Sequence, residues 1–99
     1  MSKFNDIINN ETPTLVDFYA TWCGPCQTMH PILDELKNHF GEKIKVLKID
    51  VDKNQHVASQ FKIRGVPTFM LFKSGQTIWR QSGAFPLKDL INKINPHIS

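Results

Sequence analysis

The residues best suited to carry out chemistry are two cysteines, Cys23 and Cys26, which are separated by Gly24 and Pro25. A thiol pair at this spacing is typical either of thiol–disulfide exchange or of half a tetrahedral zinc site. A structural zinc site needs a second cysteine pair or two closely spaced histidines, and the sequence has neither. The pattern therefore favours redox chemistry, with no metal ligands.

A long amphipathic helix is predicted from Cys23 to Phe40. Its apolar stripe consists of Cys26, Met29, Leu33, Leu36 and Phe40. Cys23 would lie at the helix N-terminus, where free backbone N–H groups and the helix dipole favour a thiolate. We expect Cys23 to be an exposed nucleophile with a lowered pKa, and Cys26, one turn inside, to be the shielded resolving thiol.

A buried strand is predicted directly before the cysteines, from Thr14 to Tyr19, because both of its faces are apolar except at Asp17. An ionised carboxylate is costly to bury, so the pKa of Asp17 should rise and allow it to exchange protons with a buried thiol. The alternative is a structural ion pair with Lys48 on the neighbouring strand.

The remaining elements are predicted from periodicity and turn residues. They comprise helices over 3–9, 54–61 and about 87–94, and strands over 45–51, 68–72 and 76–81. Asp52 is placed to cap the helix that follows it. Because helices separate the first three strands, we expect these to be parallel and the fourth to be antiparallel. The prediction is an α/β fold in one domain, residues 1–99, with a mixed four-stranded sheet flanked by helices on both faces.

Composition excludes several classes of function. The net charge of +3 comes from ten Lys and two Arg scattered among nine acidic residues, which predicts a solvated surface and no binding of nucleic acid. The longest apolar runs are far shorter than the roughly 20 residues of a membrane helix. The first residues do not resemble a signal peptide, so a cytoplasmic protein is expected.

Several motifs together resemble the thioredoxin family. They are Val16-Asp17-Phe18, Trp22-Cys23-Gly24-Pro25-Cys26, Pro31, Arg64-Gly65-Val66-Pro67-Thr68 and Phe72-Lys73-Ser74-Gly75. The resemblance covers about residues 14–95 and implies a thioredoxin-like fold and a protein disulfide reductase.

The resemblance also implies roles for individual residues. Cys23 would attack substrate disulfides and Cys26 would resolve the mixed disulfide, with Asp17 as the buried carboxylate and Pro67 as a cis-proline facing the cysteines. The surface that contacts substrate would consist of Trp22, Gly24, Pro25, Val66, Pro67, Gly83 and Ala84. The expected partners are disulfide-containing proteins and a flavoprotein thioredoxin reductase. The protein would be a monomer with no cofactor beyond its redox-active disulfide.

Two departures from this family bear on the fold and on the site. Only thirteen residues precede the strand at Thr14, so we expect a short form without the usual first strand, which leaves the strand over 45–51 at an edge. His30 occupies a position usually taken by Ala, on the same side of the helix as Cys26. With Lys48 it is a candidate proton relay; the alternative is a half-exposed helix residue.

Two other functions remain open at this level. One is an exported relative that acts as a disulfide oxidant or isomerase. The other is a thioredoxin-fold interaction module whose thiols are incidental.

Overall fold

All of the predicted helices and strands are present in the computed structural model, which describes residues 3–98. The helices are α1 (Lys3–Ile8), α2 (Gly24–Phe40), α3 (Gln55–Gln60) and α4 (Leu87–Ile94), with 3-10 turns at Gly41–Lys43 and Asn95–His97. The strands are β1 (Thr14–Tyr19), β2 (Lys45–Asp50), β3 (Thr68–Lys73) and β4 (Gln76–Ser82).

The four strands form one mixed sheet in the order β2-β1-β3-β4. β1 and β2 are parallel, whereas β3 is antiparallel to both β1 and β4. The expectation that β3 runs parallel to β1 is therefore wrong. A parallel connection must carry the chain back along the whole strand, about 20 Å for six residues, and α3 with six residues spans only about 9 Å. The chain instead enters β3 at the end of the sheet where the C-terminal residues of β1 and β2 lie.

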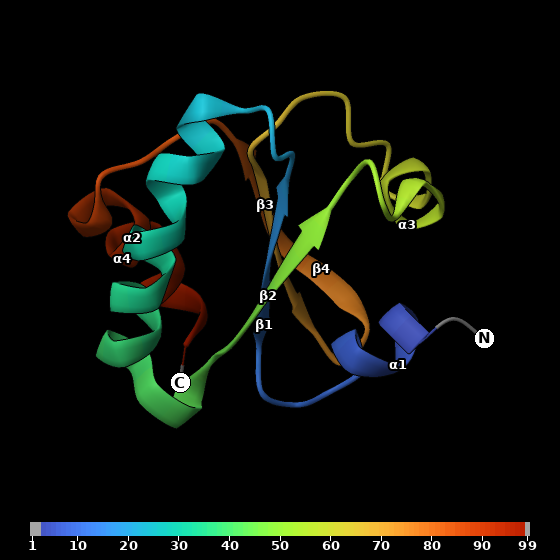
Figure 1. Ribbon diagram of the computed structural model, residues 1–99. Coiled ribbons are helices and arrows are strands. Elements are labelled where there is room, and N and C mark those ends of the chain that lie inside the picture. The colour runs from blue at the N-terminus through green and yellow to red at the C-terminus, as the bar shows by residue number, and fades with distance from the viewer. Residues whose placement is uncertain (1–2, 99) are drawn as a thin grey trace.

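Helices cover both faces of the sheet, as predicted (Figure 1). α2 and α4 lie together on one face, and α1 and α3 lie on the other. None of the described helices is long and apolar enough to cross a bilayer.

The side chains of β1 alternate between these two layers. Leu15 packs against α2 and α4, whereas Val16 and Phe18 pack against α1 and the segment that follows α3. Asp17 lies on the same face as Leu15, toward α2, where the ring of His30 approaches it. The alternation thus places a carboxylate in the interior layer next to α2.

The apolar stripe predicted for α2 is confirmed, because all five of its residues are buried. The far end of α2 is fixed by Lys37, whose Nζ donates hydrogen bonds to the carbonyl oxygens of Gly41 at 2.8 Å and Ile44 at 2.6 Å. The chain leaves the helix at Gly41, whose φ of 59° is favourable for glycine. These contacts anchor the C-terminal end of α2 and so help to fix the position of its N-terminal end.

β2 lies at one edge of the sheet, as predicted, and β4 lies at the other. Among residues 3–98 the first element is helix α1, and it is held by the buried side chains of Phe4 and Ile8. Ile7 on the same helix points outward and is 38% exposed.

Candidate active site

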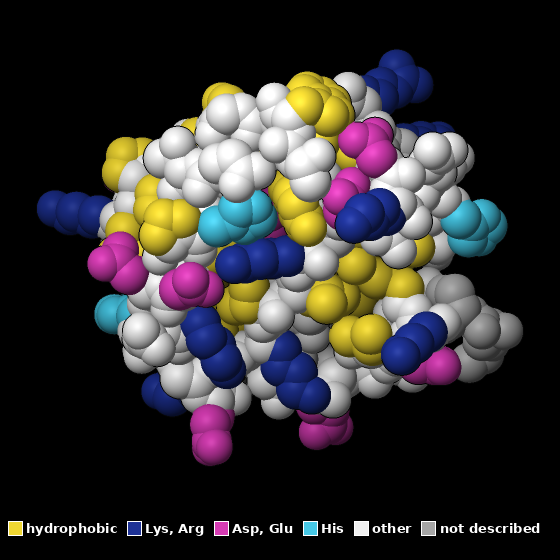
Figure 2. Space-filling model, in the orientation of Figure 1, with side chains coloured by type: hydrophobic (Ala, Val, Ile, Leu, Met, Phe, Trp, Pro, Cys, Tyr) yellow, Lys and Arg dark blue, Asp and Glu magenta, His cyan; other side chains and the backbone are white. Residues whose placement is uncertain are grey.

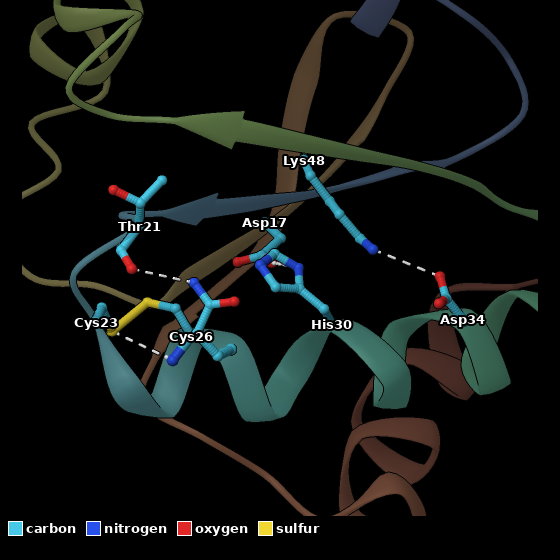
Figure 3. A network of polar contacts seen from close by, with 8 residues as sticks. Asp17, Thr21, Cys23, Cys26, His30, Asp34 and Lys48 are labelled. Carbon is cyan, nitrogen blue, oxygen red and sulfur yellow. Dashed lines mark hydrogen bonds and ion pairs between the residues drawn. A yellow bond between two sulfur atoms is a disulfide. The ribbon is translucent and has the colours of Figure 1, made fainter.

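Cys23 and Cys26 form a disulfide at the N-terminus of α2. Cys23 is the N-cap residue, and its Sγ accepts a hydrogen bond from the backbone N–H of Cys26 at 3.2 Å. The Cα atoms are 5.3 Å apart, within the usual range for a disulfide. Figure 3 shows both side chains at the first turn of the helix. The helix terminus thus directs donor groups at the sulfur of Cys23 and would stabilise its thiolate.

The two cysteines differ in exposure, although less than predicted. Cys26 is fully buried, and Cys23 retains an exposed fraction of only 6%. The expectation of an openly exposed Cys23 is wrong because the loop before β3 covers its sulfur, with the Val66 carbonyl oxygen 3.8 Å from Sγ. The Val66–Pro67 peptide bond is cis, as predicted.

Asp17 is a buried carboxylate with an unusual charge environment. Its side chain has no exposure to solvent, and neither of its oxygens has a hydrogen-bond partner within the described part of the chain. Burial raises the pKa of Asp17 from 3.8 to about 7, while the positive charge of Lys48 acts in the opposite direction. The predicted rise in pKa is confirmed.

Lys48 does not form the direct ion pair with Asp17 that was the structural alternative. The two residues are register partners on β1 and β2, but the Lys48 ammonium reaches Asp34 on α2, with an Nζ–Oδ1 distance of 3.4 Å. Lys48 acts on Asp17 through space, and Asp34 provides its contact (Figure 3).

His30 lies one turn beyond Cys26, and its ring points toward Asp17 (Figure 3). Nδ1 is 3.8 Å from Oδ2 of Asp17, and the ring contacts the edge of Tyr19 with centroids 4.9 Å apart. Desolvation lowers the pKa of His30, with a further lowering by Lys48 and a smaller opposing effect from Asp34. Pro31 follows His30 within the helix, and the His30 ring still lies against Asp17.

Trp22 is the most exposed large apolar residue near the cysteines, with an exposed fraction of 72%. Together with the loop 63–66 and Val51 it lines a shallow hollow beside the disulfide. Its indole Nε1 donates a hydrogen bond of 2.9 Å to Asp52. Sequence reasoning missed this role for Asp52 and predicted a helix cap, whereas α3 has Asn54 as its N-cap and no side-chain cap. The parallel pairing of β1 and β2 was the available signal, since it brings the segments after both strands together.

The loop between α3 and β3 is held by hydrogen bonds from its surroundings. Arg80 on β4 donates to the carbonyl oxygens of Phe61 at 2.6 Å and Lys62 at 3.2 Å. The hydroxyl of Thr68 donates to the Gly65 carbonyl at 2.7 Å. These hydrogen bonds therefore hold the loop in the position in which its Val66 carbonyl contacts the Cys23 sulfur.

The other residues expected to contact substrate surround the disulfide. The Gly83 N–H donates to the Pro67 carbonyl at 2.9 Å, and Gly83 adopts a φ of 108° that is strained for other residues. Gly83 and Ala84 are exposed, as are Gly24 and Pro25, whereas Pro67 is buried. The loop before β3 thus reaches the Cys23 sulfur through Val66, and the segment after β4 is joined to that loop through Gly83.

A mixed sheet covered by helices on both faces, with a vicinal dithiol at the start of a long helix and a cis-proline opposite, defines a class of thiol–disulfide oxidoreductases. Within residues 3–98 no cluster of three or more His, Cys, Asp or Glu residues could hold a metal ion.

Comparison with known proteins gives the family. The sequence model of thioredoxin matches residues 1–96, and the chain belongs to the thioredoxin family. It is 47% identical over 92 residues to the thioredoxin of Haemophilus influenzae, which covers 93% of this chain and 86% of that relative. It is 49% identical over 93 residues to the chloroplastic thioredoxin Y1 of Arabidopsis thaliana, covering 93% of this chain and 54% of the relative.

The solved structures agree with this assignment. A mutant thioredoxin from Halobacterium salinarum superposes with a TM-score of 0.89 at 35% identity, covering all of this chain and 86% of that one. The protein is a thiol–disulfide oxidoreductase of the thioredoxin type, and its active disulfide joins Cys23 and Cys26. The family and this bonded pair favour that function over a module with incidental thiols.

Proposed function

We propose that this protein reduces disulfides of other proteins, with Cys23 as the attacking thiol and Cys26 as the resolving thiol. The observation that carries the proposal is the position of Cys23 as N-cap of α2, where a backbone N–H already bonds its sulfur. In the reduced protein the Cys23 thiolate attacks one substrate sulfur, the substrate S–S bond breaks, and a mixed disulfide forms. The Cys26 thiolate then attacks the Cys23 sulfur and releases the second substrate thiolate. The substrate gains two electrons and the protein regains its disulfide.

Asp17 is proposed to accept the proton that Cys26 must lose before this second step. A pKa of about 7 suits a general base at neutral pH, because about half of the carboxylate is then ionised. Its position on the sheet face under the first turns of α2 supports this role (Figure 3). Lys48 assists by favouring the ionised form of Asp17.

Substrate is proposed to bind across the exposed surface around the disulfide. That surface consists of Trp22, Gly24, Pro25, Val66, Gly83 and Ala84, and the buried Pro67 follows Val66 in the same loop. An extended polypeptide segment suits it, because the Trp22 indole offers apolar area and the loops offer backbone groups. Asp52 keeps the indole in place beside the sulfur.

A flavoprotein reductase is proposed to return two electrons and two protons to the disulfide after each cycle. A dithiol that is used in the reducing direction suits a reducing compartment, which supports a cytoplasmic location. The chain itself is proposed to work as one domain, and the redox-active disulfide is its only redox group.

A monomer is proposed from the character of the surface. Positive and negative side chains are interspersed on the face seen in Figure 2, with only small apolar areas between them. Ile7 and Trp22 are the large hydrophobic residues exposed among residues 3–98, and they leave little apolar area for a permanent interface.

Trapping of partners tests the assignment of the two thiols. Cys26→Ser should accumulate mixed disulfides with substrate proteins, because the attacking thiol remains and the resolving thiol is gone. Cys23→Ser should trap none, and the wild-type protein should reduce insulin disulfides. Non-reducing electrophoresis followed by mass spectrometry measures the trapped species. Equal trapping by both variants would contradict the assignment.

A further inference from the structure

Two buried polar groups face each other behind the disulfide without hydrogen-bond partners in the described part of the chain. They are the carboxylate of Asp17 on β1 and the Nδ1 atom of His30 on α2. We propose that His30 is the relay through which Asp17 exchanges protons with solvent during the resolving step. This inference rests on the proposed function and adds a residue that acts through Asp17.

The position of the His30 ring supports a path to water. Asp17 is completely buried, whereas the His30 side chain is 22% exposed, so the imidazole joins the interior to the surface. The distance of 3.8 Å from Nδ1 to Oδ2 exceeds a hydrogen bond in this oxidised state. Catalytic contacts are often long in the resting protein and shorten when the reacting groups change charge. The edge contact with Tyr19 keeps the ring plane directed at the carboxylate.

Titratable groups on three elements surround the pair. Tyr19 packs against the ring from β1, Lys48 faces it from β2, and Asp34 and Cys26 are the titratable neighbours on α2 itself. Lys48 disfavours the imidazolium and favours the carboxylate, while Asp34 partly neutralises Lys48 through its 3.4 Å contact. Burial raises the pKa of Asp17 to about 7 and lowers that of His30, so neither group keeps the pKa that it has in water.

The Cys26 thiol gives its proton to the Asp17 carboxylate, and the resulting thiolate breaks the mixed disulfide by forming a bond to the Cys23 sulfur. The carboxylic acid of Asp17 then gives its proton to Nδ1 of His30, which forms an imidazolium. His30 releases a proton from Nε2 to water, and the departing substrate thiolate takes up a proton from solvent. Asp17 is thereby returned to its ionised form for the next cycle.

Two substitutions at His30 separate a relay from a simple cover over Asp17. His30→Gln retains bulk and polarity but cannot carry a proton, whereas His30→Ala opens a space that small molecules can enter. We expect both variants to slow resolution of a preformed mixed disulfide by about three- to tenfold at pH 7, a modest part of a usual general-base effect. Imidazole added to the buffer should restore the rate of His30→Ala. The exposed His56→Ala on α3 serves as the matched control and should be unchanged.

The pH dependence of the two His30 variants is a further test. Their loss of resolution rate should become smaller at high pH, where Cys26 ionises without help. The inference is overturned if His30→Gln restores the wild-type rate, if both variants equal or exceed the wild type, or if imidazole rescues nothing. Failure of the proposed function is recognised separately, because the wild-type protein would then fail to reduce insulin. An NMR titration gives an independent readout: Asp17→Asn should change the ring pKa of His30, whereas an unchanged value contradicts the coupling.

Discussion

The two faces of strand β1 have opposite characters, although they belong to the same six residues. On the face toward α1 and α3, Phe18 joins the rings of Phe4, Phe61 and Phe72, with neighbouring centroids 5.2–6.4 Å apart. On the face toward α2, Asp17 is buried with no hydrogen bond from the described residues. One face is hydrocarbon in edge-to-face and tilted contact, and the other contains a charge-bearing group that burial disfavours.

This difference separates what stabilises the fold from what performs the chemistry. A buried aromatic cluster contributes several kcal/mol through its apolar area and ring contacts. An unpaired buried carboxylate costs stability and persists where a function requires it. The aromatic face of β1 is thus free of the burial cost that the α2 face bears at Asp17. The two faces can be altered independently to test this division.

Phe18→Ala should have the largest effect, because it removes a fully buried ring from the centre of the aromatic cluster. We expect the free energy of unfolding to fall by about 3–5 kcal/mol. Urea denaturation of the oxidised protein measures the loss, and the rate of disulfide reduction per folded molecule should be unchanged. Ile7→Ala on the outer side of α1 is the control, with an effect of about 0.5 kcal/mol or less. A loss near that of the control would show that the aromatic cluster contributes little to stability.

Asp17→Asn should have the next largest effect and the opposite sign. A pKa of 3.8 in the unfolded chain and about 7 in the folded one means that the folded protein binds more protons between these pH values. The free energy of unfolding of the wild type should therefore fall as pH rises from about 4 to about 7 and then level off. The full difference corresponds to about 4 kcal/mol. We expect Asp17→Asn to gain about 2–4 kcal/mol at pH 8 and little at pH 4, while resolution of mixed disulfides slows.

The measurement compares urea midpoints of the two proteins across this pH range. His30 contributes with the opposite sign, because its lowered pKa makes stability increase with pH. The same comparison in a His30→Gln background isolates the contribution of Asp17. A wild-type stability that is constant between pH 4 and 8 in that background would contradict the burial cost assigned to Asp17.

Lys48→Gln should have the smallest effect. It tests whether Lys48 favours the ionised form of Asp17 on the α2 face. Loss of the ammonium should raise the pKa of Asp17, so less carboxylate is available at pH 7 and the pH profile of resolution should move to higher pH. The Lys48 side chain is 33% exposed and partly screened, so we expect a rate loss of only about twofold. Stopped-flow measurements between pH 6 and 9 follow the profile. Lys45 is an exposed lysine on the same strand, and Lys45→Gln should leave the pH profile of resolution unchanged.

Much of the fold was predictable because local patterns and burial agreed. The stripe of α2 and the apolar run around Asp17 correctly predicted the buried side of the helix and a strand that is buried on both faces, since both patterns report directly on which side chains leave water. The two cysteines and the raised pKa of Asp17 followed from the same patterns. The cis peptide before Pro67 came from the family motif and from a proline at the start of an interior strand.

The unpredicted features depend on groups that are distant in sequence. The direction of β3 depends on where α3 ends in space, and helix spacing alone contains no such information. The contact of Asp52 with Trp22 and the cover of Cys23 by Val66 each join residues 30 or more positions apart. The orientation of the His30 ring toward Asp17 depends on the separation of α2 from β1, which periodicity does not give.

The hydrogen bonds from Arg80 to the loop that covers the disulfide have a consequence for local opening. β4 is an edge strand, and edge strands separate from a sheet at a lower free energy than interior strands such as β1. When β4 detaches, Arg80 leaves Phe61 and Lys62, and the Gly83 contact with Pro67 is lost with it. The loop over the sulfur would then lose part of its support and keep the hydrogen bond from Thr68 to Gly65. Access to the disulfide is thus linked to local opening of β4, a strand that contains neither cysteine.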